Sequence, residues 1–475
     1  MTHLFSFTDV VLTRKLILRQ TNYMYFDKSL ELCQANIRLD EANMDSIIRN
    51  GGSQFVQVAT IPIADRHKTH KTIESQGVSN KGESVIQALR PVYPIARILA
   101  LPDNDEKFTW RNWKTMTCLF LLTWGIFLSS ATVIKVSGET FSYTAVGQIT
   151  FYCIVTVYLI LFLKLSTEWP DLMEEWLEVE QQMVGMPPVR AVHKIRIVFL
   201  SIFIYAIVEH VLCQLYNLER ARMCDENNFI ERYFLEIYDN VFRHFRFSMW
   251  MGIILVMMNF FLTLVWTFTD IFLMSVCIAL SVRFEQLQTS LKRIMGQDMS
   301  QEFWRESRKR YIKLSFLVKN LDEKFSLLMF FTFFNNVYSI CCLLYRALKW
   351  RDLTTIHTIY NCAAFILVTV RLYGICLAAG KIHDISKDIL PVLFAVPSQS
   401  YNVEVHRLFL QIWQDPVSLT GSRFFAITRG LVLKITGTIF TYEIVLAQFN
   451  QINPENENTM PQTNCNSNPV KLNET

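Results

Sequence analysis

Two short pairs stand close together in the last apolar stretch of the chain. Thr441-Tyr442 and Gln448-Phe449 are separated by five residues, and most of the residues around them are apolar. A glutamine at that depth is costly in lipid unless its amide meets water, a cavity or another polar group. The spacing therefore favours a segment that lines a polar pathway over one that faces only lipid.

A helix through this stretch would gather small and polar side chains on one side. At about 100° per residue, one stripe collects Gly437, Thr441, Ile444, Val445 and Gln448, with Phe449 at its flank. Small, hydroxyl, amide and aliphatic groups together suit a water-filled pore with an apolar constriction. The alternative is that Thr441 and Gln448 only hydrogen-bond to neighbouring helices, as lone polar residues in membrane spans often do.

The elements that must position these residues are membrane helices. Of the 475 residues, 51% are hydrophobic and 36 are Phe, and the chain contains apolar runs that no soluble core of this size requires. We expect an all-α membrane protein with seven transmembrane helices, each long enough for a hydrocarbon core of about 30 Å. They lie near 115–136, 145–165, 195–216, 247–270, 325–346, 355–379 and 426–449. The fourth continues to about Arg283, beyond what a bilayer needs.

Charge asymmetry sets the expected orientation. Basic residues gather between spans four and five, at Lys292, Arg293, Arg305, Arg308, Lys309, Arg310, Lys313, Lys319 and Lys324. The positive-inside rule places this loop and the N-terminus in the cytosol, and seven spans then place the C-terminus outside. The loop 217–245, assigned outside, holds four arginines, but six acidic residues accompany them.

The remaining segments complete the expected organisation. Residues 1–83 form a loosely ordered cytosolic arm, and 84–283 hold a helix before the first span and spans one to four. Amphipathic helices at 284–324 and a helical segment at 381–422 form a cytosolic helical collar. Spans five and six occupy 325–380, the pore-lining helix occupies 423–450, and 451–475 form an extracellular tail.

The eleven cysteines do not indicate a disulfide framework. Eight fall within predicted helices as small apolar side chains, namely Cys118, Cys153, Cys213, Cys277, Cys341, Cys342, Cys362 and Cys376. Cys224 and Cys465 would lie outside the cell, and whether they pair is left open. The net charge of +4 is accounted for by the cytosolic loops, so no nucleic-acid partner is expected.

Several stretches of the sequence resemble a known family. The Thr-Tyr and Gln-Phe pairs at 441–449 match the C-terminal signature of insect gustatory receptors. Residues 422–431 (SRFFAITRGL) resemble the sugar-receptor subfamily, and 88–92 (ALRPV) and 108–113 (FTWRNW) resemble the segment before its first span. The sequence departs from that pattern at 101–104, where the subfamily usually has Gly and Met, and at Lys434, where it has a small neutral residue.

The resemblance implies a ligand-gated, non-selective cation channel in the plasma membrane of gustatory receptor neuron dendrites. Four identical or related subunits would surround one pore lined by the last helix, with Gln448 and Phe449 at the constriction. Lys434 would then sit where the pore widens, or reach the headgroups. Glu443 points the opposite way and is expected to accept hydrogen bonds from spans five and six. The expected partners are a sugar, membrane lipid and monovalent cations, with divalent cations as a further candidate.

A sugar site needs hydrogen-bonding groups for hydroxyls and aromatic rings for the C–H faces. The outer halves of spans two to six supply Gln148, Tyr152, Glu209, His210, Trp250, Asn335, Asn336, Tyr338, His357, Tyr360 and Asn361. Any one of these is more often a contact between helices than a ligand contact. Glu209 is the strongest candidate, because a carboxylate at that depth is expensive unless a cavity or partner uses it. Asp270 and Arg371 are expected to form a structural pair.

Other functions fit less well. A G-protein-coupled receptor also has seven spans, but no Asp-Arg-Tyr-like triplet closes span three and no Asn-Pro-x-x-Tyr lies in span seven. An enzyme is not expected, because His210 and His357 stand without a nucleophile motif, and no metal or other cofactor is implied. A secondary transporter would show inverted repeats. A gustatory or odorant-type receptor channel for a non-sugar tastant remains the main alternative.

Overall fold

The computed structural model describes residues 84–102, 109–137, 143–183, 185–186, 190–349 and 355–452. The predicted arm over 1–83 and nearly all of the predicted tail over 451–475, including Cys465, lie outside the described residues.

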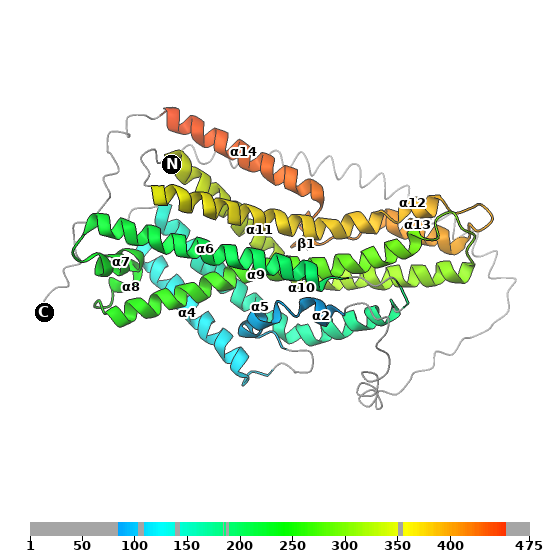
Figure 1. The fold of residues 1–475 in the computed structure, drawn as a ribbon, viewed down its shortest axis with the longest axis horizontal. Helices are drawn as coiled ribbons and strands as arrows, with labels where there is room; N and C mark the ends of the chain where they lie inside the picture. The colour runs from blue at the N-terminus through cyan, green and yellow to red at the C-terminus, as the bar shows by residue number, and fades with distance from the viewer. Residues whose placement is uncertain are drawn as a thin grey trace, which may run out of the picture. The chain divides into compact units, whose positions relative to one another are not determined.

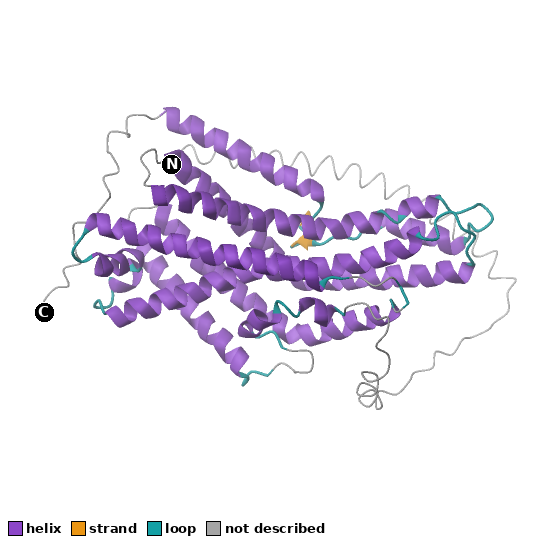
Figure 2. Ribbon diagram, viewed as in Figure 1, coloured by secondary structure: helices purple, strands orange, loops and turns teal. Residues whose placement is uncertain are grey.

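Among the described residues, six helices are long and apolar enough to cross a membrane. They are α4 (Trp113–Ser137), α5 (Tyr143–Gln182), α6 (Val192–Cys224), α9 (Met249–Lys292), α10 (Gln301–Lys349) and α11 (Thr355–Lys387). They pack together as a bundle (Figure 1), and helices account for nearly all of its regular structure (Figure 2). These six correspond to the first six predicted spans. The seventh corresponds to α14 (Arg429–Ile452), a helix of 24 residues that is not among the six.

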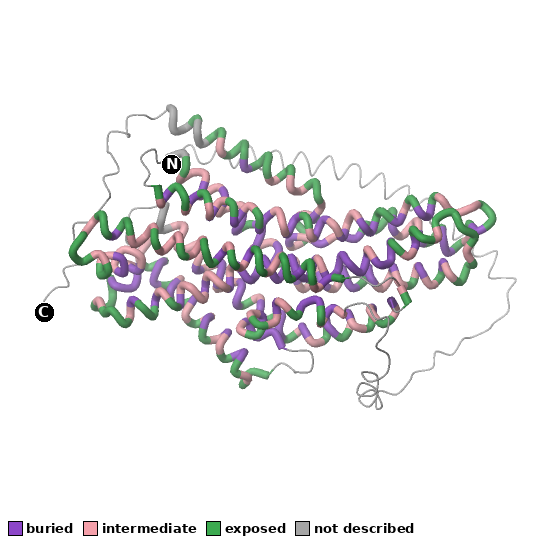
Figure 3. The backbone as a smooth tube through the Cα atoms, viewed as in Figure 1, coloured by how far each residue is buried: buried purple, intermediate pink, exposed green. Residues whose placement is uncertain are grey.

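The core of the bundle forms around α9. At 44 residues, this helix is about 66 Å long, roughly twice the thickness of a hydrocarbon core. From Val265 to Leu291 almost every side chain is buried, including polar ones such as Asp270 and Gln286. Figure 3 shows this buried stretch in the middle of the bundle. The predicted long fourth helix is therefore confirmed.

The helix α10 is longer than the sequence predicted. It runs without interruption for 49 residues, so its charged first half and its apolar second half form one helix. The amphipathic helices expected at 284–324 are thus the end of α9 and the beginning of α10. The turn between them contains Gly296 with φ 77°, a left-handed conformation that glycine adopts without a steric cost.

Two short helices, α12 (Leu390–Phe394) and α13 (Val403–Gln414), lie beside the extended ends of the long helices (Figure 1). We call α12, α13 and the adjoining ends of α9, α10 and α11 the collar. Arg308 Nε on α10 donates to Glu404 Oε2 on α13 at 2.6 Å. This hydrogen bond is the main reason that the pKa of Glu404 lies below its usual range, so the pair is charged at neutral pH.

A tight hairpin leads from the collar into α14. Strand β1 (Thr420–Gly421) pairs with β2 (Phe425–Ala426) in antiparallel register. Asp322 on α10 fixes the hairpin by accepting from the backbone N of Thr420 at 2.6 Å and from its hydroxyl at 2.8 Å. The sequence did not predict these strands, because two residues are too few to show an alternating pattern.

Prolines shorten the helix that was expected before the first span. Residues 84–102 form α2 (Val85–Leu89), α3 (Tyr93–Ala96) and the 3-10 helix η2 (Arg97–Leu99). Pro91 follows α2 and Pro94 lies in the first turn of α3, where proline is tolerated.

The mixed-charge loop after α6 contains α7 (Phe229–Ile237) and α8 (Asp239–Phe242). Arg232 pairs with Glu236 at 2.8 Å, and Lys135 of α4 pairs with Asp239 at 2.7 Å. The eight cysteines predicted to lie in helices are free, and Cys224 is disulfide-bonded.

Candidate functional site

Aromatic rings from α6 and α11 form a polar-aromatic cluster. The Tyr216 ring lies 4.7 Å from the His357 ring, between centroids, and stacks on Tyr360 at 5.5 Å and 12°. Asn361 is buried in the next position of α11, and its Nδ2 donates to the carbonyl of Leu343 on α10 at 3.5 Å. We call Glu209, Tyr216, His357, Tyr360 and Asn361 the α6–α11 cluster.

Glu209 shares one face of α6 with Tyr216, seven residues further on. Its side chain is half-buried, and among the described residues no hydrogen bond or ion pair to its carboxylate is formed. The guanidinium groups of Arg346 on α10 and Arg371 on α11 lie within electrostatic range of it, and so does Tyr360. The Glu209 carboxylate therefore lies in reach of positive charge but receives no hydrogen bond from a described residue.

Sequence reasoning missed two members of this region, Arg346 and Tyr216. Arg346 lies within electrostatic range of Glu209, His357 and Tyr360. In the sequence it resembles a charge that merely flanks the fifth span. Tyr216 could have been found from its spacing to Glu209, because seven residues correspond to two helical turns.

His210 points away from Glu209 and belongs to another network. Its Nε2 lies 3.2 Å from Nε2 of Gln214, and Tyr233 on α7 donates to Oε1 of Gln214. The His210 ring also lies 5.4 Å from that of Phe260 on α9. His210 thus connects α6 with α7 and α9, as a contact between helices would.

Three further predicted residues lie apart from the cluster. Gln148 Nε2 donates to the carbonyl of Ile237 at 3.5 Å, and Tyr152 is buried with its ring 5.2 Å from that of Phe151. Trp250, in the first turn of α9, has 77% of its surface exposed.

The predicted pair of Asp270 and Arg371 is present in the core. Their side chains are 0% and 1% exposed and form a salt bridge. Asn336 Nδ2 donates to Asp270 Oδ1 at 3.2 Å, and the Arg371 guanidinium lies 4.7 Å from the ring centroid of Trp266. Asn335 is buried nearby on α10, and its Nδ2 has no hydrogen-bond partner among the described residues. Asn336 is therefore part of a structural network.

On α14, the predicted pore residues whose side chains are described are exposed in the single chain. Gly437, Thr441, Ile444, Val445 and Gln448 are all exposed, while the side chain of Phe449 lies outside the described residues. The Thr441 hydroxyl donates to the carbonyl of Gly437 at 2.9 Å. Lys434 is exposed as well.

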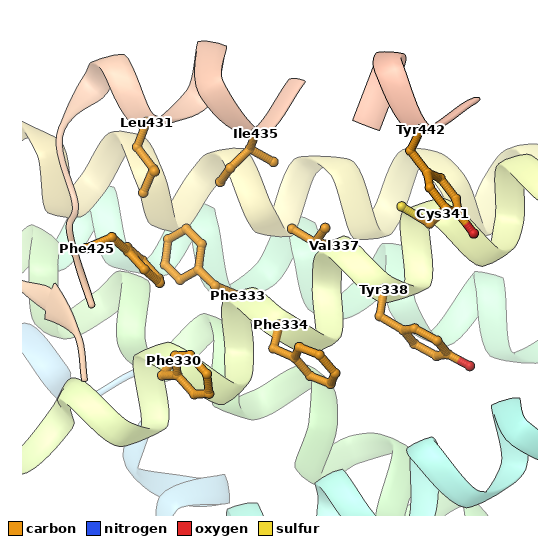
Figure 4. Close-up of a pocket in the computed structure, with 10 residues that line it drawn as sticks. All are labelled: Phe330, Phe333, Phe334, Val337, Tyr338, Cys341, Phe425, Leu431, Ile435 and Tyr442. Atoms are coloured by element: carbon orange, nitrogen blue, oxygen red, sulfur yellow. The ribbon is translucent and has the colours of Figure 1, made fainter. Parts of the chain in front are cut away.

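The opposite side of α14 faces α10. Tyr442 and Tyr338 line a groove between the two helices (Figure 4). Oε1 of Glu443 is buried and accepts no hydrogen bond from any described residue. The hydrogen bonds expected for that oxygen are therefore not formed within this part of the chain.

Comparison with known proteins decides the family. The sequence model for the trehalose receptor family matches residues 84–459. The chain belongs to this family of insect gustatory receptors. The receptor is 31% identical to the Drosophila melanogaster gustatory receptor for sugar taste 64f, over 76% of this chain and 78% of that one. It is 28% identical to gustatory receptor 5a for trehalose from the same fly, over 75% and 81%. The family consists of receptors, in agreement with the expectation that the chain is not an enzyme.

The fold of the receptor matches that of a solved insect chemoreceptor. The structure of the insect olfactory receptor OR5 from Machilis hrabei in complex with eugenol aligns with a TM-score of 0.58 at 16% identity. The alignment covers 78% of this chain and all of OR5. This match confirms the helical membrane fold that the sequence predicted, and the family model with the Drosophila relatives confirms the assignment to gustatory receptors.

Proposed function

We propose that this receptor is a sugar-gated, non-selective cation channel subunit of gustatory neurons. The names of its relatives, which refer to sugar taste and to trehalose, favour a sugar ligand. The observation that carries the proposal is the Glu209 carboxylate, half-buried beside stacked aromatic rings and without a hydrogen bond from any described residue. Such a group needs a donor, and a sugar hydroxyl is one.

The α6–α11 cluster has the chemistry of a sugar site. The carboxylate of Glu209 accepts from hydroxyl donors, and the guanidinium of Arg346 donates to hydroxyl acceptors. Tyr216 and Tyr360 offer ring faces to the C–H surface of a pyranose. Leaving a buried polar group unpaired is penalised, so a site built from such groups discriminates between sugars by the position of their hydroxyls.

Four copies of α14 would line the pore. Its stripe from Gly437 to Gln448 is exposed in a single chain, as expected for a surface completed by other subunits and by water. The subunit would span the plasma membrane seven times, with the N-terminus inside and the C-terminus outside. The exposed aromatic side chains of Trp413 on α13 and of Tyr401 in the loop before α13 would add contacts between subunits of a homo- or heterotetramer.

The test is electrical recording from cells that express the chain alone or with a related gustatory receptor, across a panel of sugars and non-sugar tastants. Glu209→Gln should shift the sugar dose-response and change the ranking of sugars, while ion preference stays the same. Gln448→Ala should alter conductance or ion preference while ligand binding persists. Glu219→Gln, the same change at an exposed position of α6, is the matched control and should leave both properties unchanged.

Two results would contradict parts of this proposal. Identical dose-response curves for Glu209→Gln and Glu219→Gln would make Glu209 a structural residue. Currents evoked only by non-sugar tastants would support the proposed channel activity and contradict the proposed sugar ligand.

A further inference from the structure

An open apolar groove runs between α10 and α14 (Figure 4). Its volume is about 560 Å³, within the range of about 300–1,000 Å³ typical of ligand pockets. Phenylalanine and aliphatic side chains form most of the lining, among them Val337 of α10 and Leu431 and Ile435 of α14. The hydroxyls of Tyr338 and Tyr442 and the Cys341 thiol are the polar side-chain groups of this lining, all toward one end.

The length of the groove is compatible with one segment of a lipid acyl chain. Leu431 and Tyr442 lie eleven positions apart on α14, which corresponds to about 16 Å along the helix axis. That is roughly half of a hydrocarbon core of about 30 Å. Its α10 wall belongs to the apolar half of a helix that can cross the membrane. The groove therefore lies at a depth where hydrocarbon is the surrounding solvent.

The rim of the groove is also apolar. Phe334 is 53% exposed and Phe424, next to β2, is 78% exposed. Water in such a groove would find almost no hydrogen-bonding partners, whereas apolar cavities favour apolar occupants. An acyl chain is such an occupant, because it needs no hydrogen-bonding partner.

We propose that this groove binds one acyl chain of a membrane phospholipid. The bound chain completes the packing of α14 against α10. Near its beginning, α14 is held by a salt bridge from Arg429 to Asp384 at 2.6 Å and by a hydrogen bond between Thr436 and Tyr373 at 2.8 Å. Both of these contacts are with α11. Toward α10, the side chains of Leu431, Ile435 and Tyr442 face the groove, so the occupant sets the distance between α14 and α10. This site does not depend on which ligand opens the receptor.

Photolabelling tests the site directly. The full chain is reconstituted in phosphatidylcholine nanodiscs that contain a phosphatidylcholine with a diazirine on one acyl chain, illuminated, and mapped by peptide mass spectrometry. Labels should concentrate on the α10 and α14 peptides that contain Val337 and Ile435. Val337→Trp and Ile435→Trp, which fill the groove from opposite walls, should each lose most of this labelling.

The control is Leu327→Trp, which adds as much volume as Ile435→Trp but does so on α10 at an exposed apolar position outside the groove. It should label like the unmodified chain. The proposal is overturned if all three variants retain the labelling. It is also overturned if the groove peptides label no more than the α6 peptide around Ile204, an apolar side chain that is 58% exposed and does not line the groove.

Discussion

At the scale of single residues, the first prediction concerns Gly437, which lies on the predicted pore stripe of α14. A Cβ atom built there meets nothing within 4 Å, so Gly437→Ala should fold normally. Alanine should even favour the helix by up to about 1 kcal/mol over glycine. Four added methyl groups around a pore should nevertheless lower single-channel conductance, which patch-clamp recording measures alongside surface expression. Unchanged conductance would indicate that Gly437 faces lipid.

The buried pair of Asp270 and Arg371 gives a second prediction. Asp270→Asn leaves the Arg371 guanidinium without its carboxylate, and breaking a buried pair from one side costs about 3–5 kcal/mol. The yield of folded receptor and its thermal midpoint in detergent should both fall. The double variant Asp270→Leu with Arg371→Leu should recover much of the loss, because removing both charges is often neutral. A double variant as unstable as the single one would contradict this explanation.

Single residues were predictable where burial alone decides their role. Asp270 and Arg371 could be paired from the sequence, since two opposite charges at similar depth need each other. Arg346 could not be placed, because its role depends on how the end of α10 packs against α6 and α11. The same holds for Glu443, whose predicted hydrogen bonds required a register between α14 and α10 that no sequence pattern specifies.

At the scale of helices, the beginning of α14 is fixed by close contact with α11. A Cβ at Gly380 would lie 2.8 Å from the backbone N of Arg429, too close for either helix to remain in place. Gly380→Ala should therefore displace α14 and cost about 1–3 kcal/mol, as overpacking does. Thermal unfolding in detergent measures the loss, and recording should show altered gating.

Gly147→Ala on α5 is the matched control, because a Cβ at Gly147, unlike one at Gly380, meets nothing within 4 Å. Equal thermal midpoints for the two variants would show that the α11–α14 contact tolerates a methyl group.

The composition of the sequence predicted which segments are helical, but it did not predict where each helix ends. The apolar runs predicted the six long helices, α14 and the extension of α9, since hydrophobic periodicity persists beyond the span. Helix α5 continues to Gln182 through Pro170, although proline normally interrupts a helix. Likewise, nothing in the sequence marks the point in α10 where the predicted collar helix becomes the fifth span.

At the scale of the whole molecule, orientation is the most direct test. An epitope placed after Thr475 should stain on intact cells, and one placed before Met1 should stain only after permeabilisation. The reason is the group of basic residues at the end of α9 and in the first half of α10, which the positive-inside rule retains in the cytosol. Staining of the C-terminal epitope only in permeabilised cells would contradict both the seven-span topology and the arrangement of the pore.

The exposed stripe of α14 has a consequence for biogenesis. In a single subunit newly inserted in the endoplasmic reticulum, the amide of Gln448 and the charge of Lys434 would face lipid or a shallow water defect, and both are costly there. Assembly with other subunits removes that cost, so an unassembled chain is the less favourable state. A subunit that lacks its proper companions should accumulate inside the cell, and reaching the surface would itself report that a complex has formed.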